Sequence, residues 1–351
     1  MVPSSDLAID LRHVAKVYRG KVHALRGIEM RVRRGEVFGL LGPNGAGKST
    51  LVKIIMTVIR PTHAEGGVLG APVGHKPTLA RVGYLPENHR FPRYLTGRQT
   101  LDFFAALAAV QRAARRKRAD QLLETVGMSA WANKRIGTYS KGMMQRIGLA
   151  QAMMNDPDLV LLDEPTDGVD PVGRREIRDV LISLKNAGKT VFINSHLLSE
   201  LEMVCDRVAI LVGGTVATQG TLDELALSRQ WYEVEIVSSS DPITAIRAAL
   251  NGSVTWGAPS EAGTSVSGPP SAAPTPPVHR GSLPNNLWIE MEGARLRIGT
   301  TDAQAVQPVL DALRRASLVV RRVQPIRPSL EELFMAAVQQ VQSGTAAGAR
   351  I

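Results

Sequence analysis

The chain has very little cysteine and no long apolar run. Cys205 is the only cysteine among 351 residues, which excludes an internal disulfide and fits a reducing compartment. Crossing a bilayer takes roughly 20 apolar residues. The longest runs, "LDFFAALAAV" and "VAILVGG", are shorter than this and predict core elements. The amino terminus has no basic stretch followed by an apolar one, so we expect neither a secretion signal nor a membrane span.

Aromatic residues are also scarce, at 4%, and basic residues outnumber acidic ones to give a net charge of +10. Lysine and arginine cluster at residues 31–35, 112–118 and 321–323. Such clusters suit nucleic acid, anionic lipid headgroups, an acidic partner or a solvated helix face. They contain no aromatic side chains of the kind that stack on bases. Charge therefore does not choose among these partners.

The first two thirds of the chain alternate between strand and helix patterns. Strands are predicted over 7–41, 159–165 and 190–196, and helices over 48–59, 96–128, from 140 onward and over 171–186. The run "LVLLDEP" at 159–165 is apolar almost throughout, which is typical of a strand buried on both faces. We therefore expect a largely parallel sheet covered by helices on both sides.

The last third has a different composition. Residues 231–237 and 287–299 alternate as half-buried strands, and a final helix is predicted over 329–341. Between the strands, residues 257–286 are rich in Pro, Gly, Ser and Ala and predict a flexible insertion. We expect a large domain over 1–225, a small α+β domain over 226–342 and a flexible tail over 343–351.

The stretch "GPNGAGKS" fits the P-loop pattern and lies between a predicted strand and a predicted helix. In such a loop the backbone N–H groups surround phosphate, and the helix dipole adds to the attraction. Lys48 supplies a charge to the terminal phosphates, and the Ser49 hydroxyl is a Mg²⁺ ligand. The pattern predicts a nucleoside triphosphate site formed by Gly42, Pro43, Asn44, Gly45, Ala46, Gly47, Lys48 and Ser49.

Two carboxylates end the apolar strand "LVLLDEP". An ionised Asp163 after buried apolar residues is costly without a nearby cation, so we expect it to meet Mg²⁺ directly or through water. Glu164 follows at the exit from the strand, where a carboxylate can orient or deprotonate a water that attacks the γ-phosphate.

The stretch "TYSKGMMQR" at 138–146 suggests a second anion-binding turn. Ser140 and Gly142 begin a predicted helix, where a serine caps free N–H groups and the helix dipole favours an anion. A plain helix cap is the alternative for a lone serine in this position.

Taken in order, these motifs resemble the ATP-binding cassette of ABC transporters. The set is the P-loop, "YSKGM", "LLDEP", "DGVD" and "NSH", and it covers residues 7–222. The carboxy-terminal "RPSLEELFMAAV" resembles bacterial ABC ATPases of the drug-, lipid- and sodium-exporting branch. The resemblance implies an α/β P-loop NTPase fold with a mixed sheet core, an antiparallel β subdomain and a helical subdomain, followed by a small α+β domain.

The resemblance also implies roles for single residues. Tyr18 matches the aromatic that stacks on adenine, although a tyrosine packed in a strand is a serious alternative. The phosphate loop extends through Thr50. Asp163 matches the Mg²⁺ carboxylate, Glu164 the catalytic carboxylate and Asp170 the loop that crosses a dimer interface. His196 matches the switch histidine that contacts the γ-phosphate.

Two positions depart from the family pattern. "GYLPEN" places Glu87 where the family usually has a glutamine that meets Mg²⁺ and water; a carboxylate binds metal more strongly but cannot donate a hydrogen bond. The family's signature usually reads Leu-Ser-Gly-Gly-Gln; in its place this chain has Tyr139, Ser140, Lys141, Gly142 and Met143. Lys141 either adds charge near the anion or points to solvent.

Within the family, each ATP lies between one chain's Lys48 loop and another chain's Ser140 turn. The resemblance therefore implies a second ATPase chain, identical or related, and separate transmembrane permease subunits at the cytoplasmic face of the plasma membrane. The rival interpretation is a soluble ABC ATPase that acts on nucleic acid or ribosomes, and a third makes the small domain a regulatory sensor. We expect no nucleic acid, because the chain has one P-loop and too few cysteines for a Cys₄ zinc site.

Overall fold

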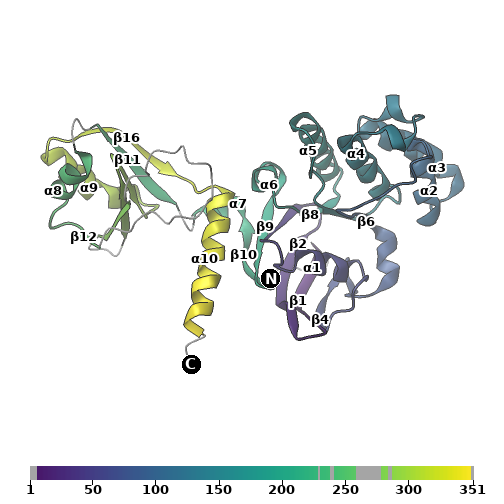
Figure 1. The fold of residues 1–351 in the computed structure, drawn as a ribbon, viewed down its shortest axis with the longest axis horizontal. Coiled ribbons are helices and arrows are strands. Elements are labelled where there is room, and N and C mark those ends of the chain that lie inside the picture. The colour runs from purple at the N-terminus through teal and green to yellow at the C-terminus, as the bar shows by residue number, and fades with distance from the viewer. Residues whose placement is uncertain (1–5, 228–229, 238–240, 258–277, 284–286, 349–351) are drawn as a thin grey trace. The chain divides into compact units, whose positions relative to one another are not determined.

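The structure is a computed structural model that describes residues 6–227, 230–237, 241–257, 278–283 and 287–348 (Figure 1). Its contacts divide the chain into two compact units. The first contains residues up to Leu222 and resumes at Leu330, and the second contains Asp223–Ser329.

The first unit is built on a sheet in the order β10-β9-β3-β8-β7-β6. Its strands are β3 (Val37–Leu41), β6 (Val82–Leu85), β7 (Leu159–Asp163), β8 (Thr190–Asn194), β9 (Arg207–Val212) and β10 (Thr215–Thr221). All pairs are parallel except β9 with β10. Every residue of β3, β7 and β8 is buried, which explains their apolar sequences. The carboxyl ends of the parallel strands therefore meet at one edge.

A second, antiparallel sheet has the order β2-β1-β4-β5. Its strands are β1 (Leu7–Tyr18), β2 (Val22–Arg33), β4 (His63–Val68) and β5 (Ala71–Pro72). Helix α1 (Lys48–Ile55) packs with both sheets in one apolar core, in which Phe38 and Phe192 stack at 5.8 Å. α1 is shorter than predicted because Thr57 takes a positive φ of 58°, which ends the helix.

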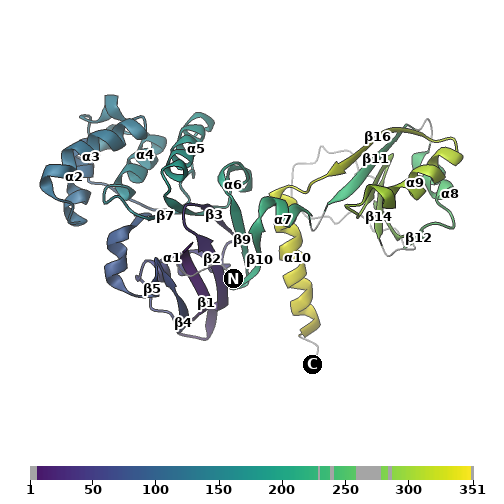
Figure 2. The ribbon, with the colours of Figure 1, turned by 180° about the vertical axis from the view of Figure 1, so that it is seen from behind.

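The other helices of this unit are α2 (Gly97–Leu107), α3 (Arg112–Thr125), α4 (Lys141–Ala152), α5 (Pro171–Asn186) and α6 (Leu198–Val204), with 3₁₀ turns η2 (Lys76–Arg81), η3 (Ser129–Trp131) and η4 (Ile136–Thr138). The predicted helix over 96–128 is two helices, which separate where Ala109 takes a φ of 58°. Both views show α4 and α5 on one side of the main sheet and α1 on the other (Figures 1 and 2). The predicted mixed sheet, antiparallel β subdomain and helical subdomain are thus present.

The second unit is a six-stranded sheet with two helices. Helix α7 (Leu222–Leu227) leads into it, followed by β11 (Trp231–Val237), α8 (Pro242–Ala249), β12 (Thr255–Trp256), β13 (Val278–Ser282), β14 (Trp288–Glu292), β15 (Arg295–Ile298), α9 (Ala303–Arg315) and β16 (Val319–Ile326). The strand order is β12-β13-β14-β15-β11-β16. Helices α8 and α9 bury its apolar face. Side chains on the other face of this sheet form ion pairs between neighbouring strands. For example, Arg280 Nε lies 2.8 Å from Glu290 Oε1.

The final helix, α10 (Leu330–Gly348), corrects the predicted domain boundaries. The predicted small domain runs over 226–342, but α10 contacts α6, β9 and β10 and belongs to the first unit. Its buried positions Leu330, Leu333 and Ala337 repeat at helical spacing, which gives the helix an apolar face to bury there. Residues 343–348 of the predicted tail continue this helix, and 349–351 lie outside the described residues.

The predicted insertion over 257–286 is also corrected in part. Residues 278–282 form β13, because they pair with β14 from Val278↔Glu292 to Ser282↔Trp288. Residues 258–277 and 284–286 lie outside the described residues. Among the residues that are described, none of the helices has both the length and the apolar composition to span a bilayer.

We predict that α10 stabilises the first unit through Leu333, which is 5% exposed. Leu333→Ala should lower the free energy of unfolding of that unit by about 2–5 kcal/mol, because it leaves a cavity in a buried contact. The matched control is Met335→Ala on the same helix, where the side chain is 50% exposed and the change should stay within about 0.5 kcal/mol. Urea unfolding of the full chain measures both, and equal losses would contradict this role of α10.

Candidate functional site

The phosphate loop connects β3 to α1 at the carboxyl edge of the main sheet. Gly45 and Gly47 take positive φ values of 81° and 107°, which favour glycine. A Cβ on Gly47 would lie 2.5 Å from the Ala24 carbonyl oxygen, so a larger residue does not fit. Ala46 N–H donates to Pro43 O at 3.1 Å and Gly214 N–H to Ala46 O at 3.1 Å, which close the loop. The loop therefore has the backbone of an anion-binding turn.

Lys48 is the first residue of α1 and is 8% exposed. Its Nζ donates to the carbonyl oxygens of Gly42 at 2.5 Å and Pro43 at 3.3 Å. Burial lowers the pKa of the ammonium, while the carboxylates of Glu164, Asp163 and Glu87 raise it. The ammonium is thus folded back onto its own loop, in the field of three acids.

Asp163 ends β7 and is 5% exposed. β7 and β8 pair in parallel with Asp163 opposite Asn194, whose Nδ2 donates to Asp163 Oδ1 at 2.5 Å. Burial raises the pKa of the Asp163 carboxyl, the charges of Glu87 and Glu164 raise it further, and the Asn194 hydrogen bond and Lys48 lower it. A buried carboxylate in this environment suits a divalent cation.

Glu164 is held by three donors on one oxygen. Its Oε2 accepts from Ser195 Oγ at 3.2 Å and from His196 N at 3.3 Å, and pairs with His196 Nδ1 at 2.8 Å. The side chain of His196 is 53% exposed, whereas that of Glu164 is 11% exposed. Glu164 also has a positive φ of 52°, a strained backbone for a non-glycine residue of the kind found at functional sites.

Glu87 and Tyr18 lie at the margin of this group. Glu87 follows β6 at the same sheet edge, is exposed, and acts electrostatically on Lys48 and Asp163. Tyr18 ends β1, is 38% exposed, and its hydroxyl lies 3.5 Å from Thr50 Oγ1. The structure thus brings Tyr18 to the phosphate loop while leaving its ring accessible.

The Ser140 turn begins a different helix from the one that follows the phosphate loop. Ser140 is the N-cap of α4, and its Oγ accepts from Met143 N–H at 3.2 Å. α4 is on the opposite side of the sheet from α1 (Figures 1 and 2). A Cβ on Gly142 would lie 3.3 Å from Val169 Cγ1, so this turn lies beside the loop that leads to Asp170. The free N–H groups of this helix end are available for an anion.

Asp170 forms a second helix cap. Its Oδ1 accepts from Gly173 N–H at 2.7 Å at the start of α5, with Pro171 at the first helical position. Residues 165–170 thus run from Glu164 to a firmly capped helix.

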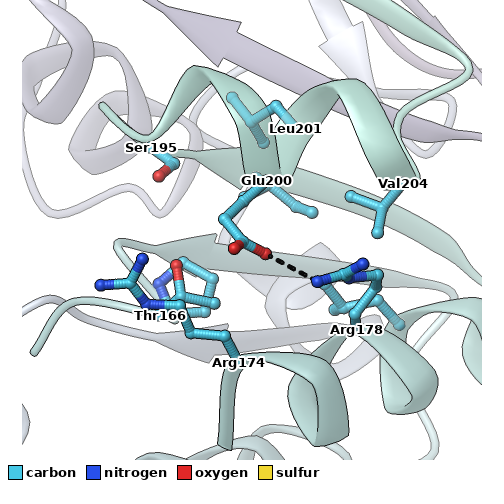
Figure 3. Close-up of a pocket in the computed structure, with 10 residues that line it drawn as sticks. Thr166, Arg174, Arg178, Ser195, Glu200, Leu201 and Val204 are labelled. Atoms are coloured by element: carbon cyan, nitrogen blue, oxygen red, sulfur yellow. Dashed lines mark ion pairs between the residues drawn. The ribbon is translucent and has the colours of Figure 1, made fainter. Parts of the chain in front are cut away.

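A small pocket lies beneath Pro165, Thr166 and Ser195, between α5 and α6. Figure 3 shows Arg178 reaching from α5 to Glu200 on α6, and the two side chains form an ion pair at 3.5 Å. Since α6 follows His196 in the chain, this pair fixes the helix that comes directly after the histidine.

Asn194 and Ser195 are site residues that the sequence did not single out. Both belong to the stretch "NSH", in which the family resemblance implies a role for His196 alone. Each is 2% exposed; Asn194 donates a hydrogen bond to Asp163, and Ser195 donates one to Glu164. The signal that could have found them is the pattern itself: two polar residues end an apolar strand, just as Asp163 and Glu164 end another one. Buried polar groups of this kind need hydrogen-bond partners.

Comparison with known proteins gives one consistent family. Residues 25–167 match a family described as ABC transporter. The chain is 48% identical over 241 residues to an uncharacterized ABC transporter ATP-binding protein of Nostoc sp., covering 66% of this chain and 71% of that protein. It is 32% identical over 333 residues to the daunorubicin resistance ATP-binding protein DrrA3 of Streptomyces coeruleorubidus, covering 94% and 96%.

Two further likenesses concern export and assembly. A fluoroquinolones export ATP-binding protein of Mycobacterium tuberculosis is 39% identical over 220 residues, covering 62% of this chain and 72% of that protein. Among solved structures, the dimeric post-hydrolysis state of the cassette MJ0796 bound to ADP and Pi has a TM-score of 0.56 and 25% identity, covering 61% and 98%.

We predict that Asp163→Asn raises the melting temperature of the chain without metal or nucleotide at pH 8. Because the folded-state pKa of Asp163 lies above its ordinary value, ionisation of this carboxyl costs stability as pH rises from the ordinary value through the folded one. The gain should shrink at acid pH, where the parent's carboxyl is protonated too. Thermal unfolding in EDTA at several pH values measures it, and a gain that does not depend on pH would contradict the burial cost.

Proposed function

The chain belongs to the family of ATP-binding subunits of ABC transporters, and we propose that it binds each ATP between its own phosphate loop and the Ser140 turn of a second chain. It is the ATP-hydrolysing subunit of such a transporter and powers movement of a substrate through separate membrane subunits. The observation that carries the two-chain arrangement is that α1 and α4, the helices that begin at the two anion-binding turns, lie on opposite sides of one sheet (Figures 1 and 2).

The phosphate loop and Lys48 hold the triphosphate. The loop amides from Gly42 to Thr50 surround the phosphates, and Lys48 exchanges the carbonyl oxygens of Gly42 and Pro43 for phosphate oxygens. Tyr18, whose hydroxyl already lies by Thr50, offers its ring to adenine.

The acids near Lys48 fit a bound Mg²⁺. Asp163 is a buried carboxylate that accepts a hydrogen bond from Asn194, and Ser49 is exposed at the loop. Glu87 is exposed and acts electrostatically on Lys48 and Asp163. We assign Ser49, Asp163 and Glu87 to the ion, directly or through water. When bound, Mg²⁺ would neutralise charge on the phosphates.

Glu164 and His196 carry the chemistry. The hydrogen bonds to Oε2 leave Glu164 Oε1 to accept a proton from an attacking water. His196, paired with Glu164 at 2.8 Å and half exposed, is placed to bring its other ring nitrogen to the γ-phosphate, to which it donates in its protonated form. The contacts of Oε2 with Ser195 and His196 hold the carboxylate at the sheet edge.

The second chain completes the site. Ser140 and Gly142 at the start of α4 present free N–H groups to the neighbour's γ-phosphate, and Asp170 lies in the loop that approaches the partner. The partner is a second copy or a related ATPase, as in the dimeric cassette structure named above. Loss of the γ-phosphate removes the link between the chains and lets them separate.

We also propose that the transporter is an exporter, because similar proteins are named for export and drug resistance. The chain would then bind at the cytoplasmic face of the plasma membrane. The exposed apolar residues Tyr94, Phe103 and Leu107 offer a contact for a membrane subunit. Ring contacts connect Phe103 through Phe104 and Phe91 to His89, two residues after Glu87. The rival role on nucleic acid or ribosomes is not favoured, since these relatives are transporter proteins.

We predict that Glu164→Gln reduces ATP turnover by at least about 100-fold, because it removes the general base, while ATP binding persists. The variant should accumulate as an ATP-dependent dimer in size-exclusion chromatography with light scattering. Ser140→Arg is the control: it should prevent this dimer without affecting ATP binding to the monomer. Turnover by Glu164→Gln at the parent rate would refute the catalytic assignment.

We predict that Leu107→Glu blocks assembly with the membrane subunit, because it places a charge in the apolar contact. Leu107 is 69% exposed, so folding and ATPase activity of the isolated chain should not change. Val58→Glu is a matched control, since Val58 is also 69% exposed but follows α1. Co-purification from membranes measures assembly, and equal recovery of both variants would contradict the proposed docking surface.

A further inference from the structure

The side chain of Lys141 forms an ion pair within its own chain. It is the first residue of α4, directly after Ser140, and its Nζ donates to Asp167 Oδ2 at 2.8 Å. The two side chains are 57% and 49% exposed, so the pair is accessible to salt. Asp167 lies in the loop between Glu164 and Asp170. The ion pair thus joins the anion-binding turn to the catalytic loop of the same chain.

Close packing supports this junction. The Lys141 stem crosses Gly168, where an added Cβ would lie 2.7 Å from its Cδ, and Gly168 has a φ of 62°. Val169 is 4% exposed and lies against the first turns of α4 and α5. An added Cβ would lie 3.3 Å from Val169 Cγ1 on Gly142 of α4 and 2.6 Å from it on Gly173 of α5. The Ser140 turn and the loop before Asp170 therefore form one packed body.

Asp167 is also linked to the catalytic pair. Its backbone N–H donates to Glu164 O at 3.2 Å. The hydrogen bond from Lys141 lowers the pKa of the Asp167 carboxyl, and the charges of Lys141, His196 and Arg174 lower it further. Lys141 is therefore connected to Glu164 through the carboxylate of Asp167 and the turn over residues 164–167, and Glu164 in turn contacts His196.

We propose that Lys141 is a positioning residue that couples the two nucleotide sites of the dimer. Through Asp167 it holds the Ser140 turn, which serves the neighbour's nucleotide, in register with the loop that carries the chain's own Glu164. This inference rests on the two-chain site proposed above. It explains why a lysine occupies a signature position where the family usually has glycine: the lysine replaces backbone freedom with a tie between the sites.

The test uses mixed dimers. A limiting amount of a hydrolysing chain is mixed with about a tenfold excess of the Glu164→Gln chain, so nearly every hydrolysing chain has an inactive partner. The single active site then combines Glu164 of the limiting chain with Ser140 of the excess chain. Lys141→Met is introduced into one chain or the other, and single-turnover hydrolysis and ATP affinity are measured.

We expect Lys141→Met to slow hydrolysis by about two- to fivefold from either chain, the range for an exposed ion pair, with monomer ATP affinity unchanged. Asp167→Asn should do the same, the double variant should be no slower, and Lys141→Arg should restore the rate. High salt should slow the parent pair more than the Lys141→Met pair. Arg81→Met is the matched control, because Arg81 pairs with Asp158 at similar exposures of 51% and 43%.

Two results would overturn the proposal. Slowing only when the excess chain carries Lys141→Met would make the lysine a local charge on the neighbour's phosphate. No slowing from either chain would make the pair an ordinary surface ion pair. If adding the Glu164→Gln chain did not raise hydrolysis by a dilute parent chain at all, the two-chain site itself would fail, which is a separate outcome.

Discussion

The register between β7 and β8 determines the chemistry at the sheet edge. Their parallel pairing places Asp163 opposite Asn194, and the next residues along each strand bring Glu164 to Ser195 and His196. A slip of one residue would turn Asp163 toward the other face of the sheet and separate these pairs. Because all ten residues of the two strands are buried, their packing fixes the register strongly. The catalytic geometry is thus a consequence of apolar strand packing.

The charges around Lys48 are unbalanced in the protein alone. Three carboxylates, those of Glu164, Asp163 and Glu87, act on one buried ammonium. Burial opposes ionisation of Asp163, so the folded chain carries a cost that a bound cation would offset. Glu87 adds to this excess where the family usually has a neutral glutamine. The replacement is therefore consistent with a site that attracts a divalent ion more strongly.

The sequence was sufficient where a motif and a strand end coincide. The phosphate loop, the acids at the end of β7 and the cap at Ser140 follow from local chemistry, and the structure contains each of these features. Partners across strands did not follow, because the bond between Asn194 and Asp163 depends on register. Likewise, α10 is apolar on one face, but no pattern within it indicates that it packs on α6 and β9 instead of on the unit that precedes it. The tie between Lys141 and Asp167 joins residues far apart in the chain, so spacing alone could not reveal it.

The most direct test of a nucleotide bridging two chains is complementation between two inactive variants. Lys48→Ala loses its own phosphate grip, and Ser140→Arg loses the turn it offers to a neighbour. In a mixed dimer of the two, one site carries both defects and the other carries none. Neither variant should pair with itself, because Ser140→Arg prevents the ATP-dependent dimer and Lys48→Ala loses the ATP that bridges it. The account therefore predicts that mixing the variants restores up to about half of the parent ATPase activity, since each mixed dimer has one intact site of two. A mixture as inactive as its components would contradict it.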